Sequence, residues 1–186
     1  MGTVVLDMAM SLDGFAADEF GNSIYPVEDL HSDGALELLI KDAGAVVMGR
    51  RAYDMAQGDF TGYEYQVPVF VLTHRAQDVV ADGQNNRLRF HFVTSGVVDA
   101  VSMARRAAGD KNVMVIGGPR TFRQCIDAGL ADELLVRLVP VLTLTGLRLF
   151  GESSVQPSSL TKLEVRDLPG RTDFRFRMVK AEVSPA

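Results

Sequence analysis

Short apolar runs recur along the first part of this chain, each bounded by turn-forming residues. A run of this kind is typical of a strand that is covered on both faces of a sheet. The runs lie at residues 3–10, 45–48, 67–72, 88–94 and 113–116. Segments with apolar residues at helical spacing separate the runs, and this pattern predicts helices. These segments begin near Ser32 or Asp33, after Gly49, at about Gly96 behind a capping Ser95, and at Pro119.

The pattern changes after residue 130, where strand-like segments follow one another. One apolar segment covers 133–142, and two more, 160–168 and 172–183, flank Pro169-Gly170-Arg171. A turn of this composition between two strands predicts a hairpin. Alternating strands and helices followed by strands predict an α/β fold. We expect a mostly parallel central sheet flanked by helices, with a C-terminal antiparallel hairpin, in a single domain spanning 1–186.

Residues 11–31 form the longest segment without a clear pattern. Loops of this length in compact domains are usually functional or disordered, so we expect a lid or a substrate wall here. Asp13, beside Gly14, is the first candidate for a catalytic contact with substrate. The alternative is a carboxylate that closes its own turn. Further candidates in this segment are Tyr25, Glu28 and Asp29, although acids before a helix also suit the helix dipole.

Composition narrows the class of protein. The chain has 186 residues and a formal net charge of −5, which argues against nucleic acid or an anionic membrane as the main partner. No apolar run approaches the ~20 residues of a membrane span, and the N-terminus lacks the pattern of a signal peptide. The single cysteine, Cys125, lies in an apolar helical pattern and is expected in the core, while His31 and His91 lack metal-ligand spacing. We therefore expect a cytoplasmic protein without a metal site.

The segment 113–122 carries the strongest functional pattern. Its apolar run leads into Gly117 and Gly118, then into Pro119 and Arg120. Glycines allow close approach of the backbone, and the N–H groups at the start of the following helix favour an anion. Arg120 adds a permanently charged donor, so the segment suits a nucleotide phosphate. The alternative is a tight turn with a solvated arginine.

Two other strand ends have the same character. Gly49 is followed by Arg50 and Arg51, where basic residues oppose the helix dipole unless an anion is bound. The strand at 67–72 is followed by Thr73, His74 and Arg75, whose side chains carry a hydroxyl, an imidazole and a guanidinium. Since parallel strands place their carboxyl ends at one edge, we expect all of these groups to meet there, where α/β proteins bind ligands.

Several segments together identify a resemblance. They follow one another in the order found in a known family and cover roughly residues 3–180. The segments are 10–15, 47–53, 69–73, 116–122, 131–134, 139–141 and 149–151. On these residues the chain resembles the dihydrofolate reductase-like fold, and most closely the reductase domain of bacterial riboflavin biosynthesis and its stand-alone relatives.

The resemblance implies NADPH as cofactor and a place for each part of it. Arg50 and Arg51, after Gly49, would hold the adenosine end, with 73–75 near the 2′-phosphate. Residues 117–121 would cradle the pyrophosphate, with a cis peptide between the two glycines. The backbone of Ala9 and the Ala16-Ala17 region would meet the nicotinamide. The cofactor residues are thus Ala9, Ala17, Gly49, Arg50, Arg51, Thr73, His74, Arg75, Gly117, Gly118, Pro119, Arg120 and Thr121.

By the same resemblance the chain would be an NADPH-dependent reductase of a small heterocycle, such as a pterin or a ribosylated pyrimidine. The alternative to this activity is a nucleotide-binding module or sensor without turnover. The resemblance also implies a homodimer that forms through the last strands. Ala52 replaces a frequent threonine, and 143–146 replaces a more glycine-rich turn near the substrate. The chain lacks the zinc signature of a deaminase, so it would only reduce.

Overall fold

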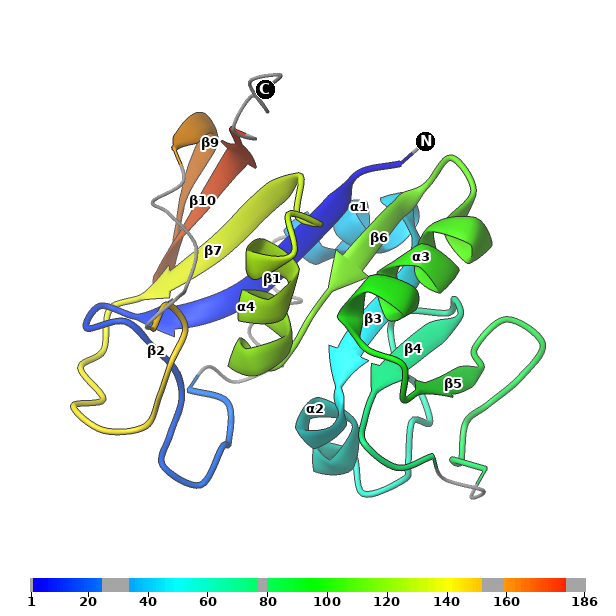
Figure 1. Ribbon diagram of the computed structural model, residues 1–186. Helices are drawn as coiled ribbons and strands as arrows, with labels where there is room; N and C mark the ends of the chain where they lie inside the picture. Colours follow the sequence, from blue (N-terminus) through cyan, green and yellow to red (C-terminus); the bar gives the residue numbers. More distant parts are fainter. Residues whose placement is uncertain (1, 25–33, 77–79, 152–158, 180–186) are drawn as a thin grey trace, which may run out of the picture.

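An eight-stranded sheet forms the centre of the molecule (Figure 1), in a computed structural model that describes residues 2–24, 34–76, 80–151 and 159–179. Its strand order is β5-β4-β3-β6-β1-β7-β10-β9. The strands of this sheet are β1 (Val4–Ser11), β3 (Ala43–Gly49), β4 (Val69–Leu72), β5 (Phe90–Val93), β6 (Asn112–Val115), β7 (Glu133–Val139), β9 (Leu160–Leu168) and β10 (Arg171–Met178). A two-stranded ribbon, β2 (Phe15–Ala17) with β8 (Leu147–Arg148), lies beside it.

The sheet is parallel from β5 to β7 and antiparallel in its last two strands. β1 occupies the middle, with Leu6 beside Val115 of β6 on one side and Leu134 of β7 on the other. The hairpin of β9 and β10 extends the sheet beyond β7. The predicted α/β sheet with a C-terminal antiparallel hairpin is confirmed.

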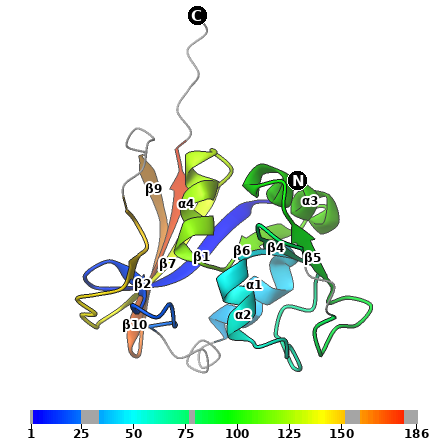
Figure 2. The ribbon, with the colours of Figure 1, turned by 60° about the horizontal axis from the view of Figure 1, so that its bottom comes forward.

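Helices cover both faces of the sheet. They are α1 (Ala35–Asp42), α2 (Arg50–Met55), α3 (Val97–Ala108) and α4 (Pro119–Asp127). Alternate residues of a strand face opposite sides, and β1 sends Leu6 to the core under α3 and α4 but Val5 to the core under α1 and α2. Figure 2 shows α1 and α2 together on the second side. Cys125 is fully buried in the first core, and burial raises the pKa of its thiol to about 12, which agrees with a packing role.

Several predicted boundaries were wrong. Ser95 does not cap α3, because Gly96 takes the N-cap position with φ 107 and no side chain donates or accepts there. The strand predicted to reach Leu142 ends at Val139, ahead of Pro140. Within the segment expected to be an irregular loop, Phe15–Ala17 forms the buried strand β2.

The remaining sequence candidates for the start of α1, Ser32 and Asp33, lie outside the described residues, and Gly34 takes the N-cap position. No helix in the described ranges is long and apolar enough to span a bilayer.

Candidate active site

A cavity of about 1300 Å³ opens at the carboxyl edge of the parallel strands. Its walls come from the ends of β1, β3, β4 and β6, the first turn of α4, the loop before β4, and the β2–β8 ribbon. The volume exceeds the 300–1,000 Å³ that is typical of pockets for one small molecule. A dinucleotide and a second small ring would both fit.

The residues assigned to a cofactor from the sequence meet at this cavity. All of them line its wall, although they come from five separate segments of the chain. They are Ala9, Ala17, Gly49, Arg50, Arg51, Thr73, His74, Arg75, Gly117, Gly118, Pro119, Arg120 and Thr121. The expectation that three strand ends converge on one edge is therefore confirmed.

Gly49 and Gly117 bring two strand ends into close contact. The Gly49 N–H donates to the Gly117 carbonyl oxygen at 2.7 Å. A Cβ on Gly49 would lie 2.6 Å from Thr121 Oγ1, so only glycine leaves room for the side chain of α4 behind it. Gly117 adopts φ 151, and the Gly117–Gly118 peptide is cis, as the resemblance implied.

The start of α4 faces the cavity. Gly118 is its N-cap residue and Pro119 its first residue, no side chain caps it, and its first turn contains no acid. Nothing lies within 4 Å of the position that a Cβ on Gly118 would take. The backbone here is open to a ligand, and the uncapped N–H groups suit the oxygens of a phosphate.

Basic side chains dominate the charge of the cavity. Among the residues that the structure describes, seven arginines and three acids contribute to its lining, in a protein whose net charge is −5. The acids are Asp7, Asp59 and Glu64, and the arginines are Arg50, Arg51, Arg75, Arg120, Arg123, Arg137 and Arg148. A cleft of one charge sign raises the local concentration of ligands of the opposite sign. The site therefore favours an anion.

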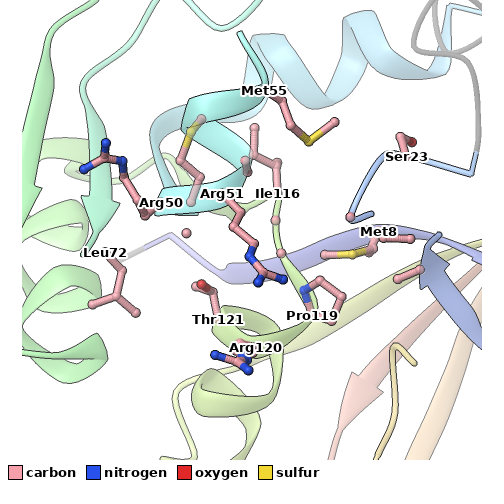
Figure 3. Close-up of a pocket in the computed structure, with 18 of the residues that line it drawn as sticks. Met8, Ser23, Arg50, Arg51, Met55, Leu72, Ile116, Pro119, Arg120 and Thr121 are labelled. Atoms are coloured by element: carbon pink, nitrogen blue, oxygen red, sulfur yellow. The ribbon is translucent and has the colours of Figure 1, made fainter. Parts of the chain in front are cut away.

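The two arginines after Gly49 differ in their surroundings. Arg50 Nε donates to Asp54 Oδ1 at 2.7 Å across one helical turn, which offsets part of the penalty expected for a basic residue at that helix start. In Figure 3 the guanidinium of Arg51 points toward the middle of the cavity and toward Pro119, whereas Arg50 points to the side of Leu72. Arg51 is the freer of the two for a ligand.

Thr73 shapes the turn that carries the next two candidates. Its hydroxyl donates to the Arg75 carbonyl oxygen at 3.0 Å and accepts from the Arg75 N–H at 3.3 Å. His74 and Arg75 are exposed, and both side chains remain at the cavity wall. Thr73 thus holds the turn, and the two residues after it present an imidazole and a guanidinium.

The other end of the cavity is apolar and closed by the β2–β8 ribbon. Met8 and Ala9 of β1 lie near Ala17 of β2 in the lining, and Gly146 packs so closely that a Cβ would meet the Ala17 carbonyl oxygen. Arg148 stacks on the Phe15 ring with its Cζ 4.5 Å from the centroid. This end suits a flat ring better than a phosphate.

Asp13, the proposed catalytic residue, does not line the cavity. Its carboxylate accepts hydrogen bonds from Ser11 Oγ at 2.6 Å, from the Thr143 N–H at 3.2 Å and from the Leu144 N–H at 2.8 Å. These bonds, led by the one from Ser11, lower the pKa of Asp13 from its ordinary value of 3.8 despite some desolvation. Asp13 therefore ties the loop after β1 to the loop after β7, which is the alternative role that its sequence allowed, and its contact with substrate stays a prediction.

Sequence reasoning missed a buried ion pair on the cavity floor. Arg137 Nε and Nη2 donate to Asp7 Oδ1 and Oδ2, each at 2.7 Å, and both side chains are buried. The signal was present: each charge interrupts an otherwise apolar strand, and two opposite charges in buried strands must find each other. Tyr63 and Tyr65 also line the cavity, whereas the sequence candidates Tyr25, Glu28, Asp29 and His31 lie outside the described residues.

Comparison with known proteins gives the family. The family model of the RibD C-terminal domain matches residues 2–172. An uncharacterized protein of Bacillus subtilis strain 168, YyaP, is 22% identical over 153 residues, covering 79% of each chain. A putative riboflavin biosynthesis protein from Shewanella sp. PV-4 superposes with a TM-score of 0.74 at 26% identity, over 96% of this chain and 99% of that one.

A larger protein contains the same fold as one part of its chain. This is a diaminohydroxyphosphoribosylaminopyrimidine deaminase/5-amino-6-(5-phosphoribosylamino)uracil reductase from Thermotoga maritima. It has a TM-score of 0.66 at 18% identity, over 96% of this chain and 57% of that one. The present chain belongs to the RibD C-terminal domain family. Its fold is the dihydrofolate reductase-like fold that the sequence segments implied.

Proposed function

We propose that this protein is an NADPH-dependent reductase of a small heterocyclic substrate. The observation that supports this most is the single cavity edge where the glycine pair, the uncapped start of α4 and an excess of arginines meet. One end of that edge is cationic and open to phosphates, and the other is apolar and suited to a ring. Membership of a family named after a riboflavin-biosynthesis protein, and relatives described as reductases, support the same reading.

NADPH is favoured over NADH by the side chains at the polar end. Arg51, His74 and Arg75 offer donors to a 2′-phosphate, whereas recognition of an NADH ribose calls for a carboxylate at the corresponding place. Asp54, the acid that follows Arg50 and Arg51 on α2, is already paired with Arg50. We therefore assign the 2′-phosphate to these three side chains.

The chain's own task in the reaction is positioning. The bound nicotinamide would supply the hydride. Ala9 and Ala17, both without bulky side chains, leave room for a flat ring beside β1. The β2–β8 ribbon and its Arg148–Phe15 stack cover that end and exclude water. Holding two rings face to face supplies much of the rate enhancement in a hydride transfer.

Titration calorimetry with NADPH and NADH tests the cofactor assignment. We expect NADPH to bind about 10–150-fold more tightly, since losing a charged hydrogen-bond partner costs about 1.5–3 kcal/mol. Equal dissociation constants would refute the preference. Decay of NADPH absorbance against pterins, flavins and pyrimidines tests turnover. Tight NADPH binding without turnover on the whole panel would favour the alternative, a binding module.

We also propose that the protein acts as a homodimer in the cytoplasm. The outer hairpin exposes apolar side chains on β9 that a sheet edge in a monomer rarely leaves uncovered. They include Leu160, Leu163 and Val165, each about two fifths exposed or more. A second copy of the chain is the occupant that we assign to this surface.

A further inference from the structure

The three side chains assigned to the 2′-phosphate are not held in place by the protein. Arg51, His74 and Arg75 are exposed, and within the described ranges their side chains have no hydrogen-bond or ion-pair partner. In Figure 3 the Arg51 guanidinium points toward Pro119 and away from Leu72, the last residue of β4. The donors at the adenosine end of the cavity can therefore change rotamer without breaking a bond.

Only the main chain of the turn after β4 is fixed. The buried Thr73 hydroxyl donates to the Arg75 carbonyl oxygen at 3.0 Å and accepts from the Arg75 N–H at 3.3 Å. The Arg75 side chain extends from this anchor into solvent, and ordering it on a ligand costs side-chain entropy. That cost is the same for every phosphate within reach, so it gives no preference for one position on a ribose.

The wall beside this turn is open. Thr94 and Gly96 follow β5 and line the cavity, and the Thr73 N–H donates to the Val93 carbonyl oxygen at 3.1 Å, which places them next to the turn. Nothing lies within 4 Å of the position that a Cβ on Gly96 would take. Because the 2′- and 3′-carbons of a ribose are adjacent, a phosphate on either one finds room at this wall.

No carboxylate at this end repels a misplaced phosphate. The described lining residues from the end of β3, from α2 and from the turns after β4 and β5 are all neutral or basic. The acids of the cavity are Asp7 of β1 and Asp59 and Glu64 of the loop before β4, and Asp99 in the first turn of α3 lies outside the lining. A site rejects the wrong isomer by placing a clash or a like charge against it. The described part of this site places neither.

We propose that the adenosine end of the cavity recognises a ribose phosphate whether it is on the 2′- or the 3′-carbon, and therefore binds 3′-phosphorylated adenosine nucleotides as well as NADPH. This rests on the proposed function, since the same three side chains are assigned to the cofactor. The ligand class is adenosine 3′,5′-bisphosphate, either free or as the head group of coenzyme A. Such a nucleotide occupies the place of the cofactor and inhibits the reductase by competition.

The first test compares three nucleotides that differ only in the ribose phosphate. They are adenosine 2′,5′-bisphosphate, adenosine 3′,5′-bisphosphate and adenosine 5′-monophosphate. By calorimetry at pH 7, we expect both bisphosphates to bind about tenfold or more tightly than the monophosphate, and within about threefold of each other. A 3′ isomer that binds no better than the monophosphate, or more than about threefold more weakly than the 2′ isomer, overturns the proposal.

A variant and a competition experiment locate the binding. Arg75→Gln should weaken both bisphosphates about tenfold and leave the monophosphate unchanged, while Arg87→Gln, outside the lining, should change none of the three. The 3′ isomer and coenzyme A should each raise the apparent Kd of NADPH, and competition by the 3′ isomer alone would support the proposal for the free nucleotide. A 3′ isomer that binds without raising the apparent Kd of NADPH, or equally well in Arg75→Gln, lies elsewhere and overturns it.

Failure of the proposed function remains distinguishable from failure of this inference. If the 2′ isomer binds tightly and the 3′ isomer does not, only the inference is wrong. If the 2′ isomer itself binds no better than the monophosphate, the assignment of NADPH is wrong. The preference for the 3′ isomer over the monophosphate, and its loss in Arg75→Gln, still decide the inference in that case.

Discussion

Gly49 lies so close to Thr121 that a Cβ on the glycine would stand 2.6 Å from the threonine Oγ1. The contact joins the end of β3 to the first turn of α4, the helix that follows the glycine pair. The shape of the cavity edge therefore depends on one missing methyl group. Gly49 lies at the cofactor end of the cavity, and its contact with Thr121 predicts that a Cβ at this position would move α4.

Gly49→Ala should lower both stability and cofactor affinity. Overpacking of a tight contact costs about 1–3 kcal/mol, and α4 must move away to relieve it. Thermal unfolding and NADPH titration measure the two effects. Thr121→Ala removes the opposing oxygen, so Gly49→Ala/Thr121→Ala should regain most of the stability that Gly49→Ala loses. Additive losses in the double variant would show that the contact is not the cause.

Arg75→Gln should separate the two nicotinamide cofactors. Arg75 is exposed at the end of the cavity assigned to the 2′-phosphate, and its backbone is held by Thr73. We expect NADPH affinity to fall about 10–150-fold and NADH affinity to stay within about twofold, because only NADPH carries the phosphate. Arg87→Gln, which changes an exposed arginine outside the cavity lining, is the control. Equal losses for both cofactors would place Arg75 elsewhere on the ligand.

Asp13→Asn should act on stability rather than on turnover. The amide places a donor where the carboxylate accepts from Ser11, Thr143 and Leu144. We expect a fall in Tm of roughly 2–4 °C, and unchanged kcat/KM per folded molecule on any substrate that the panel identifies. A large loss of kcat/KM at unchanged Tm would return Asp13 to the catalytic residues.

The Asp13 carboxylate also makes the free energy of unfolding depend on pH, in a direction that its pKa determines. The pKa of Asp13 is lowered in the folded protein, so the unfolded chain binds its proton more readily. The stability that Asp13 contributes is therefore complete above the ordinary pKa of 3.8 and is lost as the pH falls through the lower folded value. Chemical unfolding between pH 6 and pH 3 should show a shallower acid loss in Asp13→Asn than in the wild type. Parallel curves would contradict this linkage.

The dimer proposed through the exposed apolar side chains of β9 predicts the mass of the protein in solution. Light scattering at micromolar concentration should give about twice the chain mass of 20.3 kDa. Val165→Lys places a charge among the exposed apolar side chains of β9, and we expect it to give the mass of one chain without loss of the fold. Lys162→Glu on the same strand changes charge outside the apolar set and serves as the control. A wild-type mass near 20.3 kDa would refute the dimer.

The sequence predicted the order of elements and the cofactor end of the site because both depend on local patterns. An apolar run that ends in glycine, proline and arginine indicates a strand, a turn and the start of a helix, all within about ten residues of sequence. The start of α3 was predicted at about Gly96 and lies at Val97, but the capping role of Ser95 was wrong, because Gly96 adopts a positive φ and takes the N-cap position itself.

The substrate end could not be predicted, because its partners are distant in sequence. Asp7 and Arg137 meet only through the pairing of β1 with β7. Asp13 illustrates the same limit. A carboxylate beside a glycine suits both a substrate contact and a turn, and the deciding partners, Thr143 and Leu144, lie across the molecule.

The central place of β1 has a consequence for how the chain is made. β1 is made before the other strands of the sheet, yet its neighbours β6 and β7 are more than a hundred residues downstream. At about 5–20 residues per second, a nascent chain holds an apolar strand without its sheet partners for several seconds. The cavity also cannot form before β1 pairs with β6 and β7, since Ala9 and Asp7 of β1 contribute to its lining. Slower translation therefore lengthens the time during which β1 is exposed to pairing with other chains.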